Sequence, residues 1–262
     1  MIRLERAWQS DEFKSGSNNA LLPIGLDVKW NTVFQDLTVD PNILLGGMTG
    51  TGKSNFFHCA IQSLLKSIGV EGLKFILIDS KRVELPTYNQ LPNLVFPVIV
   101  DEKEARKAFE WCYGEIDRRA KIRQENKAEN AGATQIDPRI VIIIDECSDL
   151  MVADLNFYES AIRHIIDAGR ENNFGIMIGT SRPSPVDVYP QTLVESFSRR
   201  IAFQTATAAD AKVILGIEGA EKMLGNGDML YFDADADGPV RLQGFFVSEE
   251  DIKKSIKTAA GK

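Results

Sequence analysis

The amino-acid sequence predicts an α/β fold in which a mostly parallel sheet lies between two layers of helices. From Asn42 onward, apolar runs of strand length alternate with segments of helical periodicity. Several of these runs, such as Ile140–Ile144, are rich in β-branched residues and show no polar alternation, which indicates strands covered on both faces. A glycine-rich loop also stands between the first of these strands and the first long helix. Together these features predict connected strand-helix-strand units.

The individual elements follow from the same pattern. Strands are expected at Leu21–Asp27, Thr38–Asp40, Ile43–Leu45, Lys74–Ile78, Val95–Val100, Arg139–Ile144, Ile176–Gly179 and Ile201–Thr205. Helices are expected at Lys53–Ser67, Glu102–Glu125, Asn156–Glu171 and Ala208–Leu215.

The last part of the chain has a different pattern. Two apolar segments, Asp228–Phe232 and Val240–Val247, flank the turn-rich residues Asp233–Pro239, so we expect a C-terminal β-hairpin at the edge of the sheet. Ser248–Lys257 follows as a short helix, and the acidic residues of its first turn suit the helix dipole. We divide the chain into an N-terminal lead-in, residues 1–40, and a main domain, residues 41–262.

The composition is that of a soluble globular protein, with 44% hydrophobic and 26% charged residues. Its apolar runs are far shorter than the roughly 18–20 residues that cross a bilayer, and the N-terminus lacks the apolar core of a signal peptide. We therefore expect a cytoplasmic protein with no membrane segment. A net charge of −7 disfavours nucleic-acid binding by the whole surface but allows a local basic surface. Cys59, Cys112 and Cys147 are expected to be buried free thiols.

The segment Gly47–Ser54 matches the phosphate-binding pattern G-x-x-x-x-G-K-[ST] in full. Its glycines let the backbone N–H groups point at phosphates, and the following helix adds partial positive charge. Lys53 is expected to contact the β- and γ-phosphates, and the Ser54 hydroxyl to bind Mg²⁺. The predicted ATP-binding residues are Gly47, Met48, Thr49, Gly50, Thr51, Gly52, Lys53, Ser54 and Asn55.

Two acids end the buried strand Arg139–Ile144. Open α/β sheets bind ligands at the carboxyl ends of their strands, so we expect Asp145 to hold Mg²⁺ through water. Glu146 is expected to orient and deprotonate the attacking water. Lys53, Asp145 and Glu146 are thus the predicted catalytic residues of a P-loop ATPase. The 92 positions from Lys53 to Asp145 leave room for another strand and helix, and with the adjacent glutamate this indicates a RecA-like enzyme.

These residues, with others in the same order, resemble the motor domain of the FtsK/SpoIIIE DNA translocases from about Pro23 to the C-terminus. The similar segments are Leu44–Ser54, Phe75–Lys81 with Glu84-Leu85, Trp111 with Glu115–Arg119, Ile144–Met151, Thr180–Ser184 with Val186–Val188, Arg200–Phe203 and Leu224–Tyr231. The resemblance implies a homohexameric ring around double-stranded DNA, with ATP bound between neighbouring subunits.

The resemblance also implies roles for residues outside the P-loop. Arg170 stands at the position of the arginine finger, which neutralises charge on a neighbour's γ-phosphate. From the residues alone, an arginine that pairs with a helix C-terminus explains this position better. Thr180 and Ser181 occupy the sensor position, where the family usually has threonine and glutamine. Because serine is shorter, either a water fills the gap or the coupling of hydrolysis to movement is altered.

Arg182 and Lys212 are the DNA-binding residues that the resemblance implies, at positions facing the pore of the ring. Basic side chains there would contact DNA phosphates without reading sequence. A local ion pair of the loop arginine is the alternative for Arg182.

Three functions remain open from the sequence. The first is an ATP-driven double-stranded DNA translocase, and the second is an FtsK-like ATPase that couples DNA or protein to a conjugation or secretion channel. The third is a regulatory module with little turnover, which the intact Lys53, Asp145 and Glu146 disfavour. Family members often carry membrane helices before the motor and a DNA-reading module after it, and we expect neither to be encoded here.

Overall fold

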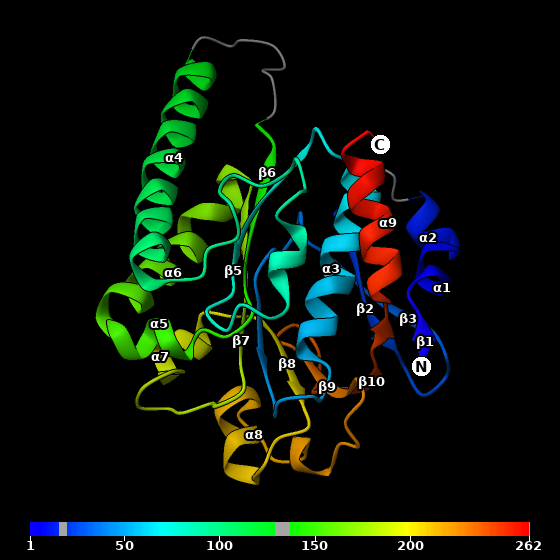
Figure 1. Cartoon of the computed structure of the whole chain (residues 1–262). Helices are drawn as coiled ribbons and strands as arrows, with labels where there is room; N and C mark the ends of the chain where they lie inside the picture. Colours follow the sequence, from blue (N-terminus) through cyan, green and yellow to red (C-terminus); the bar gives the residue numbers. More distant parts are fainter. Residues whose placement is uncertain (16–19, 129–136, 262) are drawn as a thin grey trace.

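The computed structural model describes residues 1–15, 20–128 and 137–261. A nine-stranded sheet in the order β3-β2-β10-β9-β8-β4-β7-β6-β5 forms its centre (Figure 1). The strands of this sheet are β2 Leu21–Leu26, β3 Thr32–Asp36, β4 Ile43–Gly46, β5 Leu73–Ile78, β6 Arg139–Ile144, β7 Phe174–Thr180, β8 Arg199–Phe203, β9 Asp228–Asp233 and β10 Val240–Gln243. A separate parallel pair joins β1 Ile2–Arg3 to β11 Phe245–Phe246.

The sheet has a parallel half and an antiparallel half. Strands β8, β4, β7, β6 and β5 pair in parallel, while β3, β2, β10 and β9 pair antiparallel and continue the sheet beyond β8. The parallel half arises because a helix crosses back between each strand and the next, as long crossovers require. This arrangement brings the carboxyl ends of β4, β7 and β6 to one edge.

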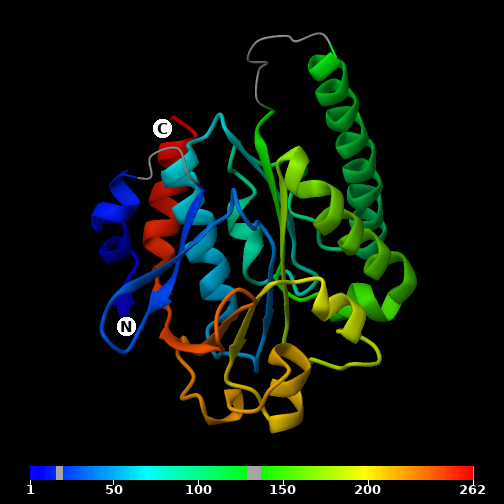
Figure 2. The same cartoon turned by 180° about the vertical axis from the view of Figure 1, so that it is seen from behind.

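Helices cover both faces of the sheet (Figures 1 and 2). The helices are α1 Glu5–Trp8, α2 Asp11–Ser15, α3 Lys53–Ile68, α4 Glu102–Ala128, α5 Ser148–Ala153, α6 Leu155–Gly169, α7 Gln191–Glu195, α8 Ala208–Leu215 and α9 Glu249–Ala259, with 3₁₀ turns η1 Leu85–Tyr88, η2 Arg170–Asn172 and η3 Ala220–Lys222. One core cluster contains residues of α1, α3 and α9, and the other contains residues of α4 to α8. The sheet is therefore the middle of three layers.

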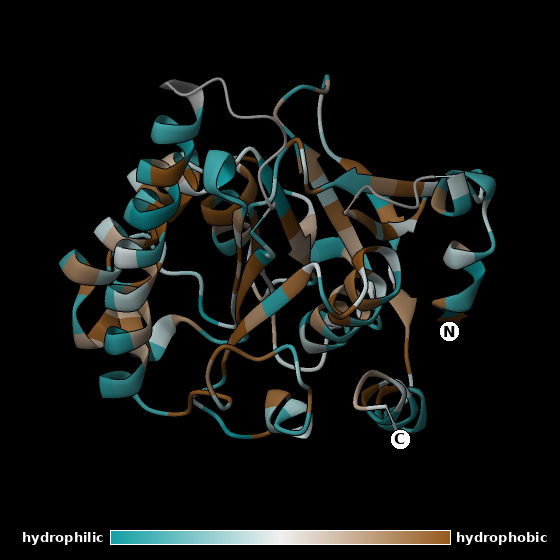
Figure 3. Ribbon diagram, turned by 90° about the horizontal axis from the view of Figure 1, so that it is seen from above, coloured by the Kyte–Doolittle hydropathy of each residue, from teal (hydrophilic) through white to brown (hydrophobic). Residues whose placement is uncertain are grey.

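Alternating side chains of β6 show how one strand serves both layers. Val141 and Ile143 belong to the cluster beneath α3, whereas Ile140, Ile142 and Ile144 pack beneath α4 to α6. Successive strand side chains point to opposite faces, so a strand covered twice must be apolar throughout. Figure 3 shows the apolar colour concentrated in the central strands and more of the polar colour on the outer helices. The three cysteines are buried and free, as predicted.

The predicted α/β class is confirmed, but three details of the prediction are wrong. Val95–Val100 is not a strand: only Leu94 and Ile99 form isolated bridges to β5, because Pro97 has no N–H to donate to a ladder. Thr38–Asp40 is a turn, and the strand is β3 instead. The Asp36 carboxylate accepts hydrogen bonds from the Thr38 N–H at 2.8 Å and hydroxyl at 2.6 Å, which ends that strand.

The third correction concerns the C-terminal hairpin. Strands β9 and β10 form it as predicted, but it lies inside the sheet, since β2 and β3 pair beyond it. The sheet is consequently half antiparallel rather than mostly parallel. Its second strand also ends early, because the chain turns at Gly244, whose N–H donates to the Gly227 carbonyl at 2.8 Å, and continues as β11.

Among the residues that the structure describes, none of the helices combines the length and the apolarity that a membrane crossing requires.

Gly179, near the end of β7, is predicted to be intolerant of a side chain. A Cβ there would lie 2.8 Å from the Asp145 carbonyl oxygen and 3.0 Å from the Phe57 ring. We expect Gly179→Ala to lower the free energy of unfolding by about 1–3 kcal/mol, because the backbone cannot yield without separating β7 from β6. Chemical denaturation measures the change.

Gly114→Ala is the matched control. Gly114 is exposed within α4, and a Cβ there meets nothing within 4 Å. It should stabilise the protein by roughly 0.5–1 kcal/mol, the helix preference of alanine over glycine. Equal effects of the two substitutions would contradict the packing described for Gly179.

Candidate active site

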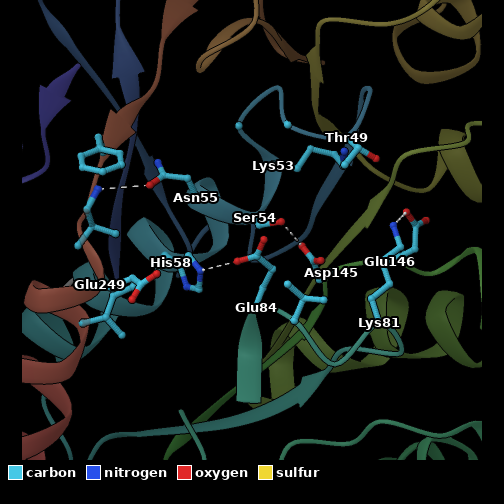
Figure 4. A pocket seen from close by; sticks show the side chains of 16 residues that line it. Thr49, Lys53, Ser54, Asn55, His58, Lys81, Glu84, Asp145, Glu146 and Glu249 are labelled. Carbon is cyan, nitrogen blue, oxygen red and sulfur yellow. Dashed lines mark hydrogen bonds and ion pairs between the residues drawn. The ribbon is translucent and has the colours of Figure 1, made fainter. Parts of the chain in front are cut away.

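A cavity of about 520 Å³ lies at the carboxyl edge of the parallel strands (Figure 4). The loop after β4 and the first turn of α3 form one wall, through residues including Lys53 and Ser54. Asp145 and Glu146, which follow β6, line it as well. Its remaining walls come from the loop after β5 and from residues at the start of α9. All predicted catalytic residues except Arg170 therefore line one cavity.

Glycines at fixed positions give the loop Gly47–Ser54 its shape. Gly47, Gly50 and Gly52 have φ values of +147°, +80° and +129°, which L side chains rarely adopt. Close packing adds a second reason at Gly52, where a Cβ would lie 3.0 Å from the backbone of Gly227. The Gly227 N–H also donates to the Thr51 carbonyl at 2.8 Å. The loop is thus supported from behind by the turn before β9.

Lys53 lies at the centre of this loop. Its ammonium donates to the carbonyl oxygens of Gly47 at 2.6 Å and Met48 at 3.0 Å, and the residue is 7% exposed. Burial lowers the pKa of the Lys53 ammonium, while the nearby carboxylates of Glu146 and Asp145 raise it. A cation held in this way next to two acids is placed to bind phosphate oxygens.

Ser54 and Asp145 meet across the end of β7. The Ser54 hydroxyl donates to Asp145 Oδ1 at 3.0 Å, although the two residues are 91 positions apart (Figure 4). Burial raises the pKa of the Asp145 carboxyl to about 6, with the Ser54 hydrogen bond opposing the rise and the charge of Asp79 adding to it. The two oxygens form a pair of hard donors of the kind that divalent cations bind.

Glu146 is 2% exposed and is held by several donors. Its Oε1 accepts from the hydroxyls of Thr180 at 2.6 Å and Ser148 at 2.9 Å. Its Oε2 accepts from Lys81 Nζ at 2.9 Å and from the N–H and hydroxyl of Ser181 at 2.9 and 2.5 Å. Burial alone would raise the pKa of this carboxyl, but hydrogen bonds from Ser181, Thr180 and Lys81 outweigh it and hold the pKa at about 2. Glu146 is therefore an ionised carboxylate at neutral pH.

The two predicted sensor residues contact Glu146 directly. Thr180 also accepts, through its carbonyl oxygen, a hydrogen bond from the Gly47 N–H at 3.3 Å, so it joins the P-loop to Glu146. Ser181 lies next to Glu146 and donates two hydrogen bonds to it, from its backbone N–H and from its hydroxyl. Because of these contacts, a shift of the phosphate-binding loop would alter the hydrogen bonds that Thr180 and Ser181 make to Glu146.

Arg170, Arg182 and Lys212 do not line this cavity. Arg170 is exposed in η2, before β7, at the opposite end of that strand from Thr180. Arg182 is exposed on the loop after β7, at the same edge as the cavity. Lys212 on α8 is also exposed and pairs with Glu218 at 2.9 Å. Asn55 lines the cavity, and its side chain also donates to the Phe245 carbonyl of β11 at 2.6 Å.

Two features of the site were not assigned a role from the sequence. Lys81 belongs to a segment that matches the family, yet its contact with Glu146 depends on the path of the loop after β5. Asp79 shapes that loop: its buried carboxylate accepts hydrogen bonds from the N–H groups of Lys81, Val83, Glu84 and Leu85. An acid followed by a polar loop after a buried strand was the only available signal.

Comparison with known proteins identifies the family. The model of the FtsK/SpoIIIE family matches residues 3–136. The chain belongs to the FtsK/SpoIIIE family. This confirms the resemblance inferred from the sequence.

Curated members of the FtsK/SpoIIIE family are similar along nearly all of this chain. DNA translocase FtsK of Clostridium tetani is 36% identical over 266 residues, which cover 97% of this chain and 36% of that protein. DNA translocase SftA of Bacillus subtilis is 35% identical over 271 residues, which cover 98% of this chain and 28% of that protein. The chain thus spans about a third of the length of these relatives.

Two solved structures share the fold of this chain. The cytoplasmic domain of the type VII secretion ATPase EccC of Thermomonospora curvata has a TM-score of 0.78 and 23% identity, over 93% of this chain and 31% of that chain. The pCW3 conjugation coupling protein TcpA, in its monomer form with ATPγS, has a TM-score of 0.80 and 22% identity, over 98% of this chain and 73% of that chain. Both comparisons establish the P-loop ATPase fold.

Lys53→Ala is predicted to abolish tight nucleotide binding while leaving the fold intact. The substitution removes the cation that the loop presents, and a charged hydrogen bond to phosphate is worth about 1.5–3 kcal/mol, or roughly 10–100-fold in affinity. Calorimetric titration with ATPγS measures the loss. Lys66→Ala serves as the control because Lys66 is on the same helix but does not line the cavity. A Lys53→Ala protein that binds ATPγS normally would contradict this site.

Proposed function

We propose that this chain is the motor of an ATP-driven double-stranded DNA translocase, which hydrolyses Mg-ATP between the subunits of a ring. The observation that carries the proposal is the convergence of Lys53, Ser54, Asp145 and Glu146 on one cavity at the carboxyl edge of the sheet. Ligands of open α/β sheets bind at this edge. The names of the curated relatives, DNA translocases, supply the type of work that hydrolysis performs.

The residues present fit a magnesium ion. The Ser54 hydroxyl and the Asp145 carboxylate lie within hydrogen-bond distance of each other, and both offer the oxygen ligands that Mg²⁺ prefers. In this proposal Ser54 and Asp145 would hold the ion, Asp145 through water. A bound Mg²⁺ would supply positive charge against the negative charge that develops on the phosphate oxygens.

The protein residues supply the remaining steps of hydrolysis. The N–H groups of the loop Gly47–Ser54 and the Lys53 ammonium orient the phosphates. Glu146, ionised and one position beyond Asp145, orients the attacking water and receives its proton as the water oxygen bonds to the γ-phosphorus, while the bond from that phosphorus to the bridging oxygen breaks and ADP leaves. Thr180 links the phosphate-binding loop to Glu146, because it accepts a hydrogen bond from the Gly47 N–H and donates one to the Glu146 carboxylate.

The position of Arg170 favours action on a neighbouring subunit. Arg170 precedes β7 and Thr180 ends it, and the seven residues of this strand span roughly 20 Å. No side chain covers that distance, so Arg170 does not reach the phosphates of its own subunit. An arginine finger supplied by a neighbour in a homohexameric ring accounts for its place at the far end of the sheet.

Contact with DNA is proposed for Arg182 and Lys212. Both are exposed, and both follow strands of the parallel half, β7 and β8. Exposed cations contact phosphates without reading sequence, as movement along DNA requires. The net charge of −7 is compatible with this, because only the wall of a pore has to be basic.

The extent of the motor and its location are part of the proposal. We assign the motor to residues 41–262 and a lead-in to residues 1–40, although β2 and β3 of the lead-in pair with the main sheet. The motor is proposed to act in the cytoplasm, where ATP and DNA are available.

Linear duplex DNA is predicted to raise the rate of ATP hydrolysis strongly, with Lys53→Ala as the blank. Arg182→Ala should raise the DNA concentration needed for half-maximal stimulation by about tenfold, because it removes a phosphate contact. A coupled assay of ADP release at low and moderate salt measures both effects. Lys257→Ala is the matched control, since Lys257 is an exposed cation on α9, away from this edge.

Other outcomes of that assay separate the alternatives. Activity that ignores DNA but rises with a protein partner favours the coupling of a substrate to a conjugation or secretion channel. A rate of ATP hydrolysis equal to that of Lys53→Ala favours the third alternative, a regulatory module with little turnover.

Mixing two inactive variants is predicted to restore activity if Arg170 acts between subunits. Arg170→Ala and Glu146→Gln should each lose hydrolysis, but an interface with Glu146 from one and Arg170 from the other is complete. In an equal mixture about a quarter of the interfaces have this composition, so a comparable fraction of wild-type activity is expected. Steady-state ATPase assays of each variant and of the mixture measure it. No recovery on mixing, in proteins that exchange subunits, would exclude this role.

A further inference from the structure

Glu146 has more hydrogen-bond donors than its carboxylate has positions for them. Two carboxylate oxygens offer about four lone-pair sites in all. Oε1 accepts from Thr180 and Ser148, and Oε2 accepts from Lys81 Nζ and from both donors of Ser181. In this arrangement no site is left for a water molecule. Because five donors share four sites, two of them must leave before Glu146 orients the water of hydrolysis.

Lys81 is the donor best able to leave. Its side chain is 44% exposed and lies on four rotatable bonds, whereas Thr180 is fully buried at the end of a central strand. Ser181 holds Glu146 partly through its backbone N–H, which cannot move without the strand. The Lys81 ammonium alone combines a mobile side chain with a charge that another anion can attract.

Lys81 also lines the cavity that contains Lys53 and Ser54. Figure 4 places its side chain beside Glu146, and its Nζ lies 3.4 Å from the Ser181 hydroxyl. A triphosphate in this cavity carries several negative charges and strong acceptor oxygens, so it competes with Glu146 for the ammonium. Because the Ser181 side chain is short, the Lys81 ammonium lies within reach of both the Glu146 carboxylate and a triphosphate in the cavity.

The loop that carries Lys81 is fixed at its base. The buried Asp79 carboxylate accepts the N–H of Lys81 at 3.1 Å and those of Val83 and Glu84 at 3.0 and 2.9 Å. Arg82 has a φ of +59°, which turns the chain sharply after Lys81. The backbone is therefore preorganised, and only the Lys81 side chain has to move between the two anions.

We propose that Lys81 is a positioning residue that holds Glu146 in a fully hydrogen-bonded arrangement until the γ-phosphate of a bound triphosphate takes over its ammonium. The transfer leaves Oε2 with only the two donors of Ser181, and the rotatable Ser181 hydroxyl then yields its position to the attacking water. Hydrolysis is thereby confined to the state in which a γ-phosphate is present. With ADP bound, the Lys81 ammonium stays hydrogen-bonded to Glu146. This proposal rests on the proposed ATPase site, but it does not depend on DNA being the substrate that is moved.

The test is a set of binding measurements with ATPγS and ADP on the full chain. Lys81→Met should weaken ATPγS binding about tenfold or more and change ADP binding by less than about twofold, because only ATPγS offers the third phosphate. Lys81→Arg should restore most of the affinity for ATPγS. Lys107→Met, an exposed lysine on α4, is the matched control and should bind both nucleotides as the wild type does.

A double-mutant cycle tests the competition itself. Glu146→Gln should tighten ATPγS binding by about threefold to tenfold relative to ADP, and this gain should vanish in the Lys81→Met background. A gain that persists without Lys81, or no gain at all, overturns the proposal. Equal weakening of both nucleotides by Lys81→Met also overturns it. If Lys81→Met does not fold, the single Glu146→Gln comparison and Lys81→Arg still decide.

These results are separable from the fate of the proposed function. If the wild-type protein fails to bind ATPγS, both the proposed ATPase function and the proposed role of Lys81 are excluded. Normal ATPγS binding with the expected cycle, but without stimulation by DNA, removes the translocase and retains the role of Lys81.

Discussion

Thr180 carries two hydrogen bonds in different directions from the end of β7. Its carbonyl oxygen accepts the Gly47 N–H of the phosphate-binding loop, and its hydroxyl donates to Glu146. The order β4-β7-β6 makes this possible, because β7 separates the strand before the loop from the strand before the acids. Gly179, which lacks a side chain, allows Asp145 and Phe57 to approach the same strand end. The site therefore depends on three parallel strands that end at the same level.

The sequence was sufficient to predict the parts of the site that local patterns encode. Gly47–Ser54 and the acids after Arg139–Ile144 are recognisable because a strand, a loop and a charge must follow one another in the chain. The contact of Lys81 with Glu146 could not be predicted in this way, because it requires the turn that Asp79 and the positive φ of Arg82 impose. Such a turn leaves no periodic signal.

The errors in the predicted fold have similar causes. Val95–Val100 is apolar enough for a strand, but Pro97 removes a donor, and periodicity does not register this. The hairpin of β9 and β10 was correctly expected, yet its place inside the sheet depends on pairing with β2, about two hundred residues earlier. Pairing between such distant segments is decided by packing and register, which a reading along the chain does not reveal.

Asn55 extends the influence of the phosphate-binding helix to both ends of the fold. Asn55 follows Ser54 directly in the sequence. Its side-chain amide donates a hydrogen bond to the Phe245 carbonyl and accepts one from the Val247 N–H. Strand β11 in turn pairs with β1, and α9 begins two residues after Val247. The first turn of α3 is thus joined by hydrogen bonds to β11, which pairs with β1 and leads into α9, so the two ends of the chain are anchored at the phosphate-binding helix by contacts that lie outside the central sheet.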